Sequence, residues 1–169
     1  MHLFGVAESI DSRTKIQKMV YILQCMGFPF PEPYRYHLHG PYSENLTREL
    51  GQLADMGFLD VSVDDLGDDV KRFSYRSTDK LKEFLIEVPD TVPSTDQGIE
   101  FEAVVGELNG KPSSVLEAAA TAVFLNRMGT SRPNLRQELL RRKPHLVRWI
   151  DPALEYLDTL SGRGWLKLR

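Results

Sequence analysis

Histidine and cysteine are the side chains in this sequence that are best suited to metal binding or nucleophilic chemistry. His37 and His39 are two residues apart, so on a strand they would share one face and could hold a metal together. The other histidines, His2 and His145, are distant in sequence, and Cys25 falls within a helical apolar pattern. We therefore expect no metal site, and a buried thiol rather than a reactive one.

Motifs that mark known catalytic or phosphate-binding sites are absent from the sequence. It contains neither Gly-x-Gly-x-x-Gly nor Gly-x-x-x-x-Gly-Lys, and neither His-Glu-x-x-His nor Gly-x-Ser-x-Gly. We therefore expect a protein that is not an enzyme and that uses no cofactor.

Clustered positive charge is the strongest candidate for a functional site. The 169-residue chain carries 21 basic and 24 acidic residues, a formal charge of −3, so any attraction to nucleic acid must be local. Residues 127–148 contain seven basic residues, and Glu138 is the only acidic residue among them. The basic residues are Arg127, Arg132, Arg136, Arg141, Arg142, Lys143 and Arg148. Such a face could hold phosphates, could be a solvated surface, or could dock on an acidic segment of a second copy.

Two helices are predicted in the N-terminal half from apolar residues at helical spacing. The first begins at a cap, Asp11 or Ser12, and stops at Gly27. The second begins at a cap on Ser43 and stops at Gly57. These caps set the boundaries of both helices.

Strands are predicted where apolar and polar residues alternate. Residues 34–39 should form a half-buried strand, and residues 58–63 and 70–75 a hairpin around an acidic turn at 64–69. The side chains expected on the inner face of the first strand are Tyr34, Tyr36 and Leu38. Helix, strand, helix and hairpin is the order of a winged helix. Lys71, Arg72 and Arg76 would then lie on the returning strand of the wing.

The expected fold is α+β and mainly α, in two parts. A winged-helix-like unit covers residues 1–88, a linker covers 89–97, and a helical half covers 98–169. Residues 50–59 and 154–166 share a weakly similar pattern, a leucine-containing helix that ends at a glycine. The sequence therefore leaves open whether the helical half is a second helix-turn-helix-like unit.

Three local signals predict details of the helical half. Ser114 and Glu117 match a capping box. Pro133 and Pro152 suit the first turns of two further helices. Residues 165–168 should close the chain as a short strand.

Charge on the second helix of the predicted winged helix is unfavourable for DNA. This helix usually enters the major groove, yet it exposes one basic residue, Arg48, against Glu44, Glu49 and Asp55. The predicted wing carries further carboxylates that would repel phosphate: Asp60, Asp64, Asp65, Asp68 and Asp69.

The first predicted helix has a pattern of the Lys-x-Gln-Lys-x-x-Tyr kind, and a Gly-Pro lies downstream of it: Lys15, Gln17, Lys18, Tyr21, Gly40, Pro41, Tyr42 and Ser43. These residues carry a resemblance to the bacterial YwgA-like proteins and, more distantly, to the Panacea domains of SocA-type antitoxins. It brings no catalytic residue, and the antitoxin relatives imply neutralisation of a toxin by protein contact. The connection at residues 29–33 departs from the pattern by its three prolines.

Two functions follow as expectations. The first is a non-enzymatic, winged-helix-like regulatory protein that contacts double-stranded DNA through Arg72, Arg76, Arg132, Arg136, Arg141, Arg142, Lys143 and Arg148. The second is an antitoxin-like or adaptor protein whose acidic second helix and hairpin engage a basic partner such as a toxin. A cytoplasmic location is expected, without a membrane partner, because no leader pattern and no long apolar run is present. The oligomeric state stays open.

Overall fold

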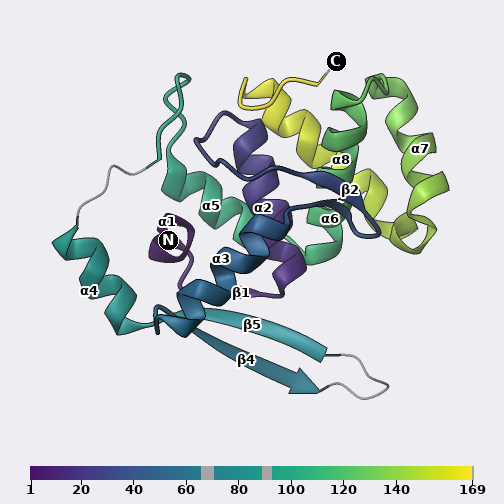
Figure 1. Ribbon diagram of the computed structural model, residues 1–169. Helices are drawn as coiled ribbons and strands as arrows, with labels where there is room; N and C mark the ends of the chain where they lie inside the picture. Colours follow the sequence, from purple (N-terminus) through teal and green to yellow (C-terminus); the bar gives the residue numbers. More distant parts are fainter. Residues whose placement is uncertain (66–70, 89–92, 169) are drawn as a thin grey trace.

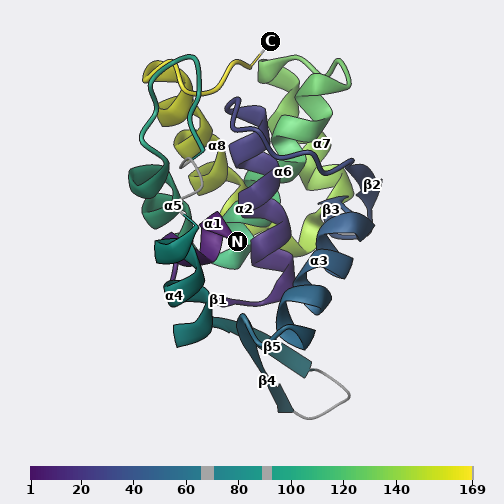
Figure 2. The same ribbon diagram turned by 60° about the vertical axis from the view of Figure 1, so that its left-hand side comes forward.

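Helix α2 (Arg13–Cys25) lies at the centre of the molecule, and the other elements pack around it (Figures 1 and 2). The computed structural model describes residues 1–65, 71–88 and 93–168. The Ser12 hydroxyl caps α2 by accepting a hydrogen bond from the Lys15 N–H at 3.2 Å. The predicted first helix and its cap are therefore confirmed.

Helices carry most of the structure, and the strands form two small antiparallel sheets, so the expected α+β, mainly α class is confirmed. The other N-terminal elements are α1 (His2–Val6), β1 (Ser9–Asp11), β2 (Arg35–His37), β3 (Gly40–Tyr42), α3 (Glu44–Asp55), β4 (Leu59–Asp65), β5 (Lys71–Ser77) and α4 (Asp79–Glu87). The C-terminal elements are α5 (Phe101–Asn109), α6 (Ser113–Arg127), η1 (Arg132–Asn134), α7 (Leu135–Arg142), η2 (Pro144–Leu146) and α8 (Val147–Gly162).

The larger sheet has the strand order β1-β5-β4 and lies at the bottom of Figure 1. Its β4–β5 hairpin was predicted and is confirmed, although the acidic turn residues Asp68 and Asp69 lie outside the described residues. β1 was not predicted. It contributes Ile10, which is fully buried, and pairs antiparallel with β5.

The predicted half-buried strand at residues 34–39 is shorter than expected, and its predicted burial is wrong. Only Arg35–His37 is extended, and it pairs with Gly40–Tyr42 in a sheet of its own. Gly40 has a φ of +82°, which reverses the chain directly after the strand. As a result Leu38, expected inside, is 76% exposed at the tip of this hairpin.

Three predictions for the helical half are also wrong. No strand closes the chain at residues 165–168, because the Trp165 N–H bonds back to the Leu160 carbonyl at the end of α8. Pro152 lies inside α8 rather than opening it, since η2 leads directly into this helix. The proposed capping box is not formed: α6 begins at Ser113 without a side-chain cap, and Glu117 has other partners.

The two predicted halves share one hydrophobic core. α2 packs against α6, and α6 packs in turn against α8. Buried residues from both halves belong to the same apolar cluster, among them Ile16, Met19, Leu116 and Leu157. Within the described ranges, no helix combines the length and the apolar character needed to cross a bilayer.

Candidate functional site

The residues of the YwgA-like motif meet where α2 passes the β2–β3 hairpin. Gln17 binds the backbone of Ser43 at two points: its Nε2 donates to the Ser43 carbonyl and its Oε1 accepts from the Ser43 N–H, both at 2.8 Å. The Ser43 hydroxyl is then free to cap α3 by accepting from the Leu46 N–H at 3.3 Å. Gln17 therefore fixes the start of α3 against α2.

Lys18 holds the same loop from the next position of α2. Its Nζ donates a hydrogen bond of 2.6 Å to the Pro41 carbonyl, and the side chain is buried. Burial lowers the pKa of Lys18 to about 8, and the carboxylate of Glu117 opposes this only in part. A lysine so placed ties the hairpin to the core.

The low pKa of Lys18 predicts a pH dependence of stability. The folded chain releases this proton at about pH 8, whereas the ordinary pKa of lysine is 10.5, so the unfolded chain binds more protons between these values. Stability attributable to Lys18 should therefore rise with pH across this window, by up to about 3 kcal/mol.

Comparison with Lys18→Met isolates this contribution, because the methionine fills the space without titrating. We expect the difference in unfolding free energy between the two proteins, measured by denaturant titration from pH 7 to pH 10, to favour the parent increasingly. A difference independent of pH would contradict the prediction. The buried Tyr21 and Tyr34, whose pKa values are raised mainly by burial, act above this range in both proteins.

The remaining motif residues pack and do not form a catalytic arrangement. Tyr21 stacks edge-on against Tyr34 with ring centroids 4.9 Å apart, and the Tyr34 hydroxyl donates to the Gln17 carbonyl at 3.2 Å. Lys15 donates to the Asn109 carbonyl at the end of α5, and Tyr42 shares a hydrogen bond of 2.8 Å with a threonine of α3. The motif thus joins α2 to the hairpin, α3 and α5.

Glu117 of α6 is the centre of a second polar cluster. Its Oε1 lies 3.0 Å from Lys143 Nζ, 3.7 Å from His39 Nδ1 and 3.6 Å from His145 Nε2. Lys143 is buried and also donates to the Leu38 carbonyl at the hairpin tip. This cluster therefore fastens the tip of β2–β3 to the C-terminal half.

Lys143 must accordingly be removed from the predicted nucleic-acid face. Its ammonium points inward to a carboxylate and a carbonyl, so it is not available to phosphate. The two predicted metal candidates also separate, with His39 near Glu117 and His37 against the ring of Tyr42. Among the described residues, no group of three or more His, Cys, Asp or Glu side chains could hold a metal ion.

Two arginines of the predicted DNA face bind aspartates of α8. Arg132 donates two hydrogen bonds of 2.9 and 2.6 Å to the carboxylate of Asp158. Arg136 donates two of 2.8 and 3.0 Å to the carboxylate of Asp151. Bidentate pairs of this kind are the strongest arrangement for a guanidinium. Both arginines, Arg132 of η1 and Arg136 of α7, are therefore already paired with carboxylates of α8.

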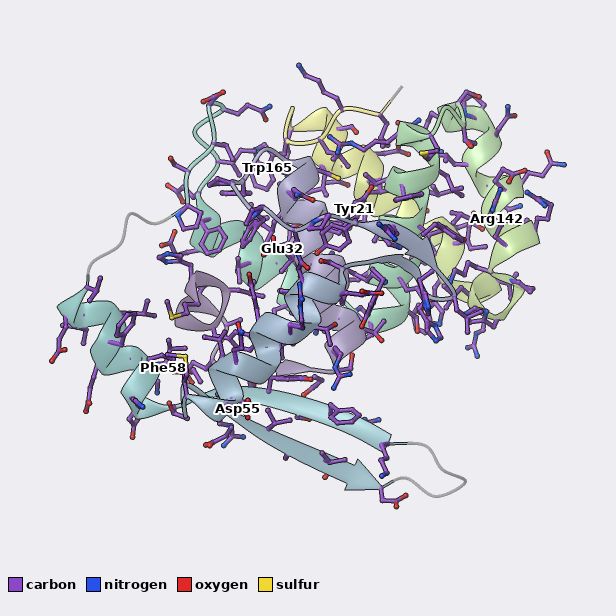
Figure 3. The ribbon with its side chains drawn as sticks, viewed as in Figure 1. Tyr21, Glu32, Asp55, Phe58, Arg142 and Trp165 are labelled. Carbon is purple, nitrogen blue, oxygen red and sulfur yellow. The ribbon has the colours of Figure 1, made fainter. Side chains whose placement is uncertain are left out.

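The arginines at the end of α7 share one carboxylate. Glu138 accepts from Arg141 at 2.8 Å and from Arg142 at 3.1 Å, and these hydrogen bonds lower its pKa. The Arg142 guanidinium also lies over the ring of Tyr36, 5.7 Å from its centroid, and Figure 3 shows Arg142 on the outer side of α7. Arg148 is exposed and forms no ion pair within the described residues.

The two arginines of β5 that were predicted to contact DNA lie directly across from aspartates of β4. Arg76 of β5 is in register with Asp60 of β4, and Arg72 is in register with Asp64. These four side chains share one face of the hairpin, where opposite charges on paired strands attract. Since β4 has β5 as its neighbour on one side and no described strand on the other, the carboxylates lie at the edge of the sheet and the arginines inside it.

Some of these partners had no signal in the sequence. The aspartates on α8 and Glu117 are far along the chain from the basic residues that they bind, so no local spacing links them. Cys25 is only partly buried, less than expected, and burial raises the pKa of its thiol. It lines a cavity of about 550 Å³ together with Arg127 and Trp165, the latter labelled in Figure 3.

A curated protein is similar to this chain over almost its whole length. The uncharacterised protein YwgA of Bacillus subtilis (strain 168) is 28% identical over 162 residues, which cover 95% of this chain and 93% of YwgA. The chain is a homologue of YwgA. The expected YwgA-like resemblance is therefore confirmed, and the similarity to YwgA extends through the helical half. No family model and no solved structure matches the chain.

Proposed function

We propose that this chain is a non-enzymatic protein-interaction module, with a winged-helix-like N-terminal unit, that binds an extended basic segment of a partner protein along the edge of β4. The element order supports the winged-helix likeness: α1, β1, α2, the β2–β3 hairpin, α3 and then the β4–β5 hairpin, with the sheet order β1-β5-β4 in the larger sheet. The acidic edge of β4 is the observation that carries the binding proposal.

The shape of β4 suits the addition of a strand. It is seven residues long, every residue after Leu59 is exposed, and the hairpin projects beyond the helices in Figure 1. An edge strand offers a row of backbone donors and acceptors to a partner chain. Seven residues suffice for a stable strand pairing when side chains add to it.

The side chains of β4 specify the chemistry of such a partner. Val61 and Val63 are 39% and 50% exposed on one face, while Asp60 and Asp64 lie on the other. A segment that alternates basic and apolar residues would match both faces at once. Two copies of β4 fit worse, because the antiparallel register centred on Ser62 would place Asp60 of each copy opposite Asp64 of the other.

The alternative, binding of double-stranded DNA by the basic residues, has less support. Arg132, Arg136, Arg141 and Arg142 all have carboxylate partners within the chain. Phosphate would have to displace these carboxylates, which would then remain beside the duplex as unpaired negative charges and repel it. The helix α3 exposes more acid than base, as the sequence indicated.

A peptide that alternates lysine and valine over about seven residues tests the proposal. We expect it to bind the full chain at about 0.15 M salt, measured by fluorescence anisotropy, and Asp60→Asn with Asp64→Asn to weaken binding at least tenfold. The matched control is Glu83→Gln with Glu87→Gln on α4, which removes the same charge from another exposed surface and should change nothing.

Two further binding measurements distinguish pairing of the peptide backbone with β4 from attraction between charges alone. The same peptide with alternate backbone nitrogens methylated keeps its charge but loses donors, so it should fail to bind. A duplex of about 20 base pairs should show no retention at this salt concentration. Tight duplex binding without peptide binding would overturn the proposal in favour of the DNA alternative.

A further inference from the structure

A small pocket lies between α1, α2, α3 and the proline-rich connector that follows α2. Its volume is about 290 Å³, near the lower end of the range for ligand sites. Most of its wall is apolar and comes from all four segments: Phe4, Ile16, Val20, Phe30, Leu50 and Leu53. The pocket is separate from the β4 edge and from the clusters around Lys18 and Glu117.

Two carboxylates interrupt this apolar wall. Glu32, which stands between two prolines of the connector, is 5% exposed, and its Oε2 has no hydrogen-bond partner. Glu49 of α3 lines the same pocket, and Figure 3 shows Glu32 beside α3. A buried carboxylate oxygen without a partner is costly to the fold, which indicates a site shaped for something other than stability.

The pocket has a negative electrostatic environment. Burial raises the pKa of Glu32 and a backbone hydrogen bond lowers it, while Glu49 raises it further through its charge and through a hydrogen bond between the two carboxyl groups. The groups with charge at the pocket are the two carboxylates, the α-amine of Met1 and, when protonated, His2. With both carboxyl groups ionised, the Met1 ammonium balances only one of the two negative charges, and Glu32 Oε2 has no hydrogen-bond partner.

We propose that this pocket binds a small amphipathic cation, with an ammonium group against Glu32 and Glu49 and an apolar body among the leucine, isoleucine and phenylalanine side chains. The orphan oxygen of Glu32 then gains a charge-assisted hydrogen bond. Binding also removes the apolar body of the ligand and the apolar walls of the pocket from water, which adds to the affinity. This site does not depend on the proposed function of β4.

An ammonium group could come from a free amine or from a lysine side chain of a partner. The small volume of the pocket favours the free amine, because the backbone on either side of a lysine would have to be accommodated at its mouth. Binding should also be linked to protonation. Since the pKa of Glu32 is raised and a protonated Glu32 cannot pair with the cation, affinity should fall as the solution is acidified.

The test compares 2-phenylethylammonium with 2-phenylethanol, which has the same shape without the charge. Titrations are followed by the NMR shifts of the methyl groups of Leu46, Leu50 and Leu53 in the full chain, without an N-terminal tag. We expect saturable shifts with the ammonium and at least tenfold weaker binding of the alcohol. N-acetyl-lysinamide, which represents the lysine side chain, should also bind at least tenfold more weakly.

Variants assign the binding to the pocket. Glu32→Gln should weaken the ammonium at least tenfold and Leu53→Trp should block it by filling the pocket, whereas Glu83→Gln on α4 should have no effect. Glu32→Gln should leave peptide binding at β4 unchanged, which keeps the two proposals distinguishable. Equal binding of amine and alcohol, unchanged binding in Glu32→Gln, or lysinamide binding as tightly as the amine would each overturn the proposal.

Discussion

Replacing Lys143 by alanine is expected to lower the free energy of unfolding by about 3–5 kcal/mol. The reason is that Lys143 is buried between Glu117 and the Leu38 carbonyl, so its removal leaves a largely buried carboxylate without its closest cation. The loss should appear as a lower midpoint in urea unfolding. The exposed ends of the cluster, His39 and His145, are too solvated to compensate.

Two further variants decide whether the buried pair is the cause. Arg142→Ala, one residue earlier, removes an exposed ion pair and should cost less than about 1 kcal/mol. Removing both charges with Lys143→Met and Glu117→Leu should recover much of the loss, because no unpaired charge is then buried. A similar, small effect of Lys143→Ala and Arg142→Ala would show that the cluster contributes little to stability.

Gly40→Ala is expected to destabilise the fold by about 2–4 kcal/mol through two separate effects. An alanine Cβ would lie 2.5 Å from Thr121 Oγ1 on α6, and the φ of +82° is unfavourable for any residue with a side chain. Both costs fall on the hairpin turn that Lys18 and Lys143 hold. Thermal unfolding monitored by circular dichroism measures the sum.

Gly164→Ala serves as the matched control for Gly40→Ala. Its φ of +75° is similar, but nothing lies within 4 Å of the added Cβ, so only the backbone cost of about 1 kcal/mol remains. Combining Gly40→Ala with Thr121→Ala should recover the steric part. Equal effects at the two glycines would contradict the close packing of the hairpin on α6.

Local signals explain why the helix caps could be predicted from the sequence. Ser12, Ser43 and Thr78 each precede an apolar helical pattern, and each hydroxyl accepts from the N–H three residues later. Such a cap depends only on its own helix. The same holds for the β4–β5 hairpin, whose alternation and acidic turn are contained in one short segment.

Long-range partners explain why the candidate site could not be predicted in the same way. The arginines of η1 and α7 suggested a free basic face in the sequence because their partners, Asp151 and Asp158, belong to the next helix, α8. Lys143 looked like one more surface charge, although α6 and the β2–β3 hairpin bury it. Counting basic residues in the sequence therefore gives more positive charge than the surface makes available to phosphate.

Short elements and isolated residues were missed for a related reason. Three residues, Ser9–Asp11, carry too little alternation to predict a strand, yet pairing with β5 completes the larger sheet. Glu32 gave a weak signal, a single carboxylate between prolines, whose meaning depends on Glu49 and on the apolar residues that α1, α2 and α3 bring beside it.

The YwgA-like motif has a structural role that bears on the proposed function. Gln17 and Lys18 hold Ser43 and Pro41, and through them set where α3 begins. α3 in turn leads through Gly57 into β4, so the motif positions the base of the hairpin. Asp55 and Phe58 in Figure 3 mark this passage from helix to strand.

Hydrogen exchange of the chain with and without the lysine–valine peptide is the most direct test of binding at the β4 edge. The proposal predicts slower exchange of amides within Leu59–Asp65 in the complex, with exchange over α7 and α8 unchanged. The same experiment with duplex DNA should slow no amide. Protection confined to α7 and α8, with β4 exchanging as in the free chain, would contradict the proposal.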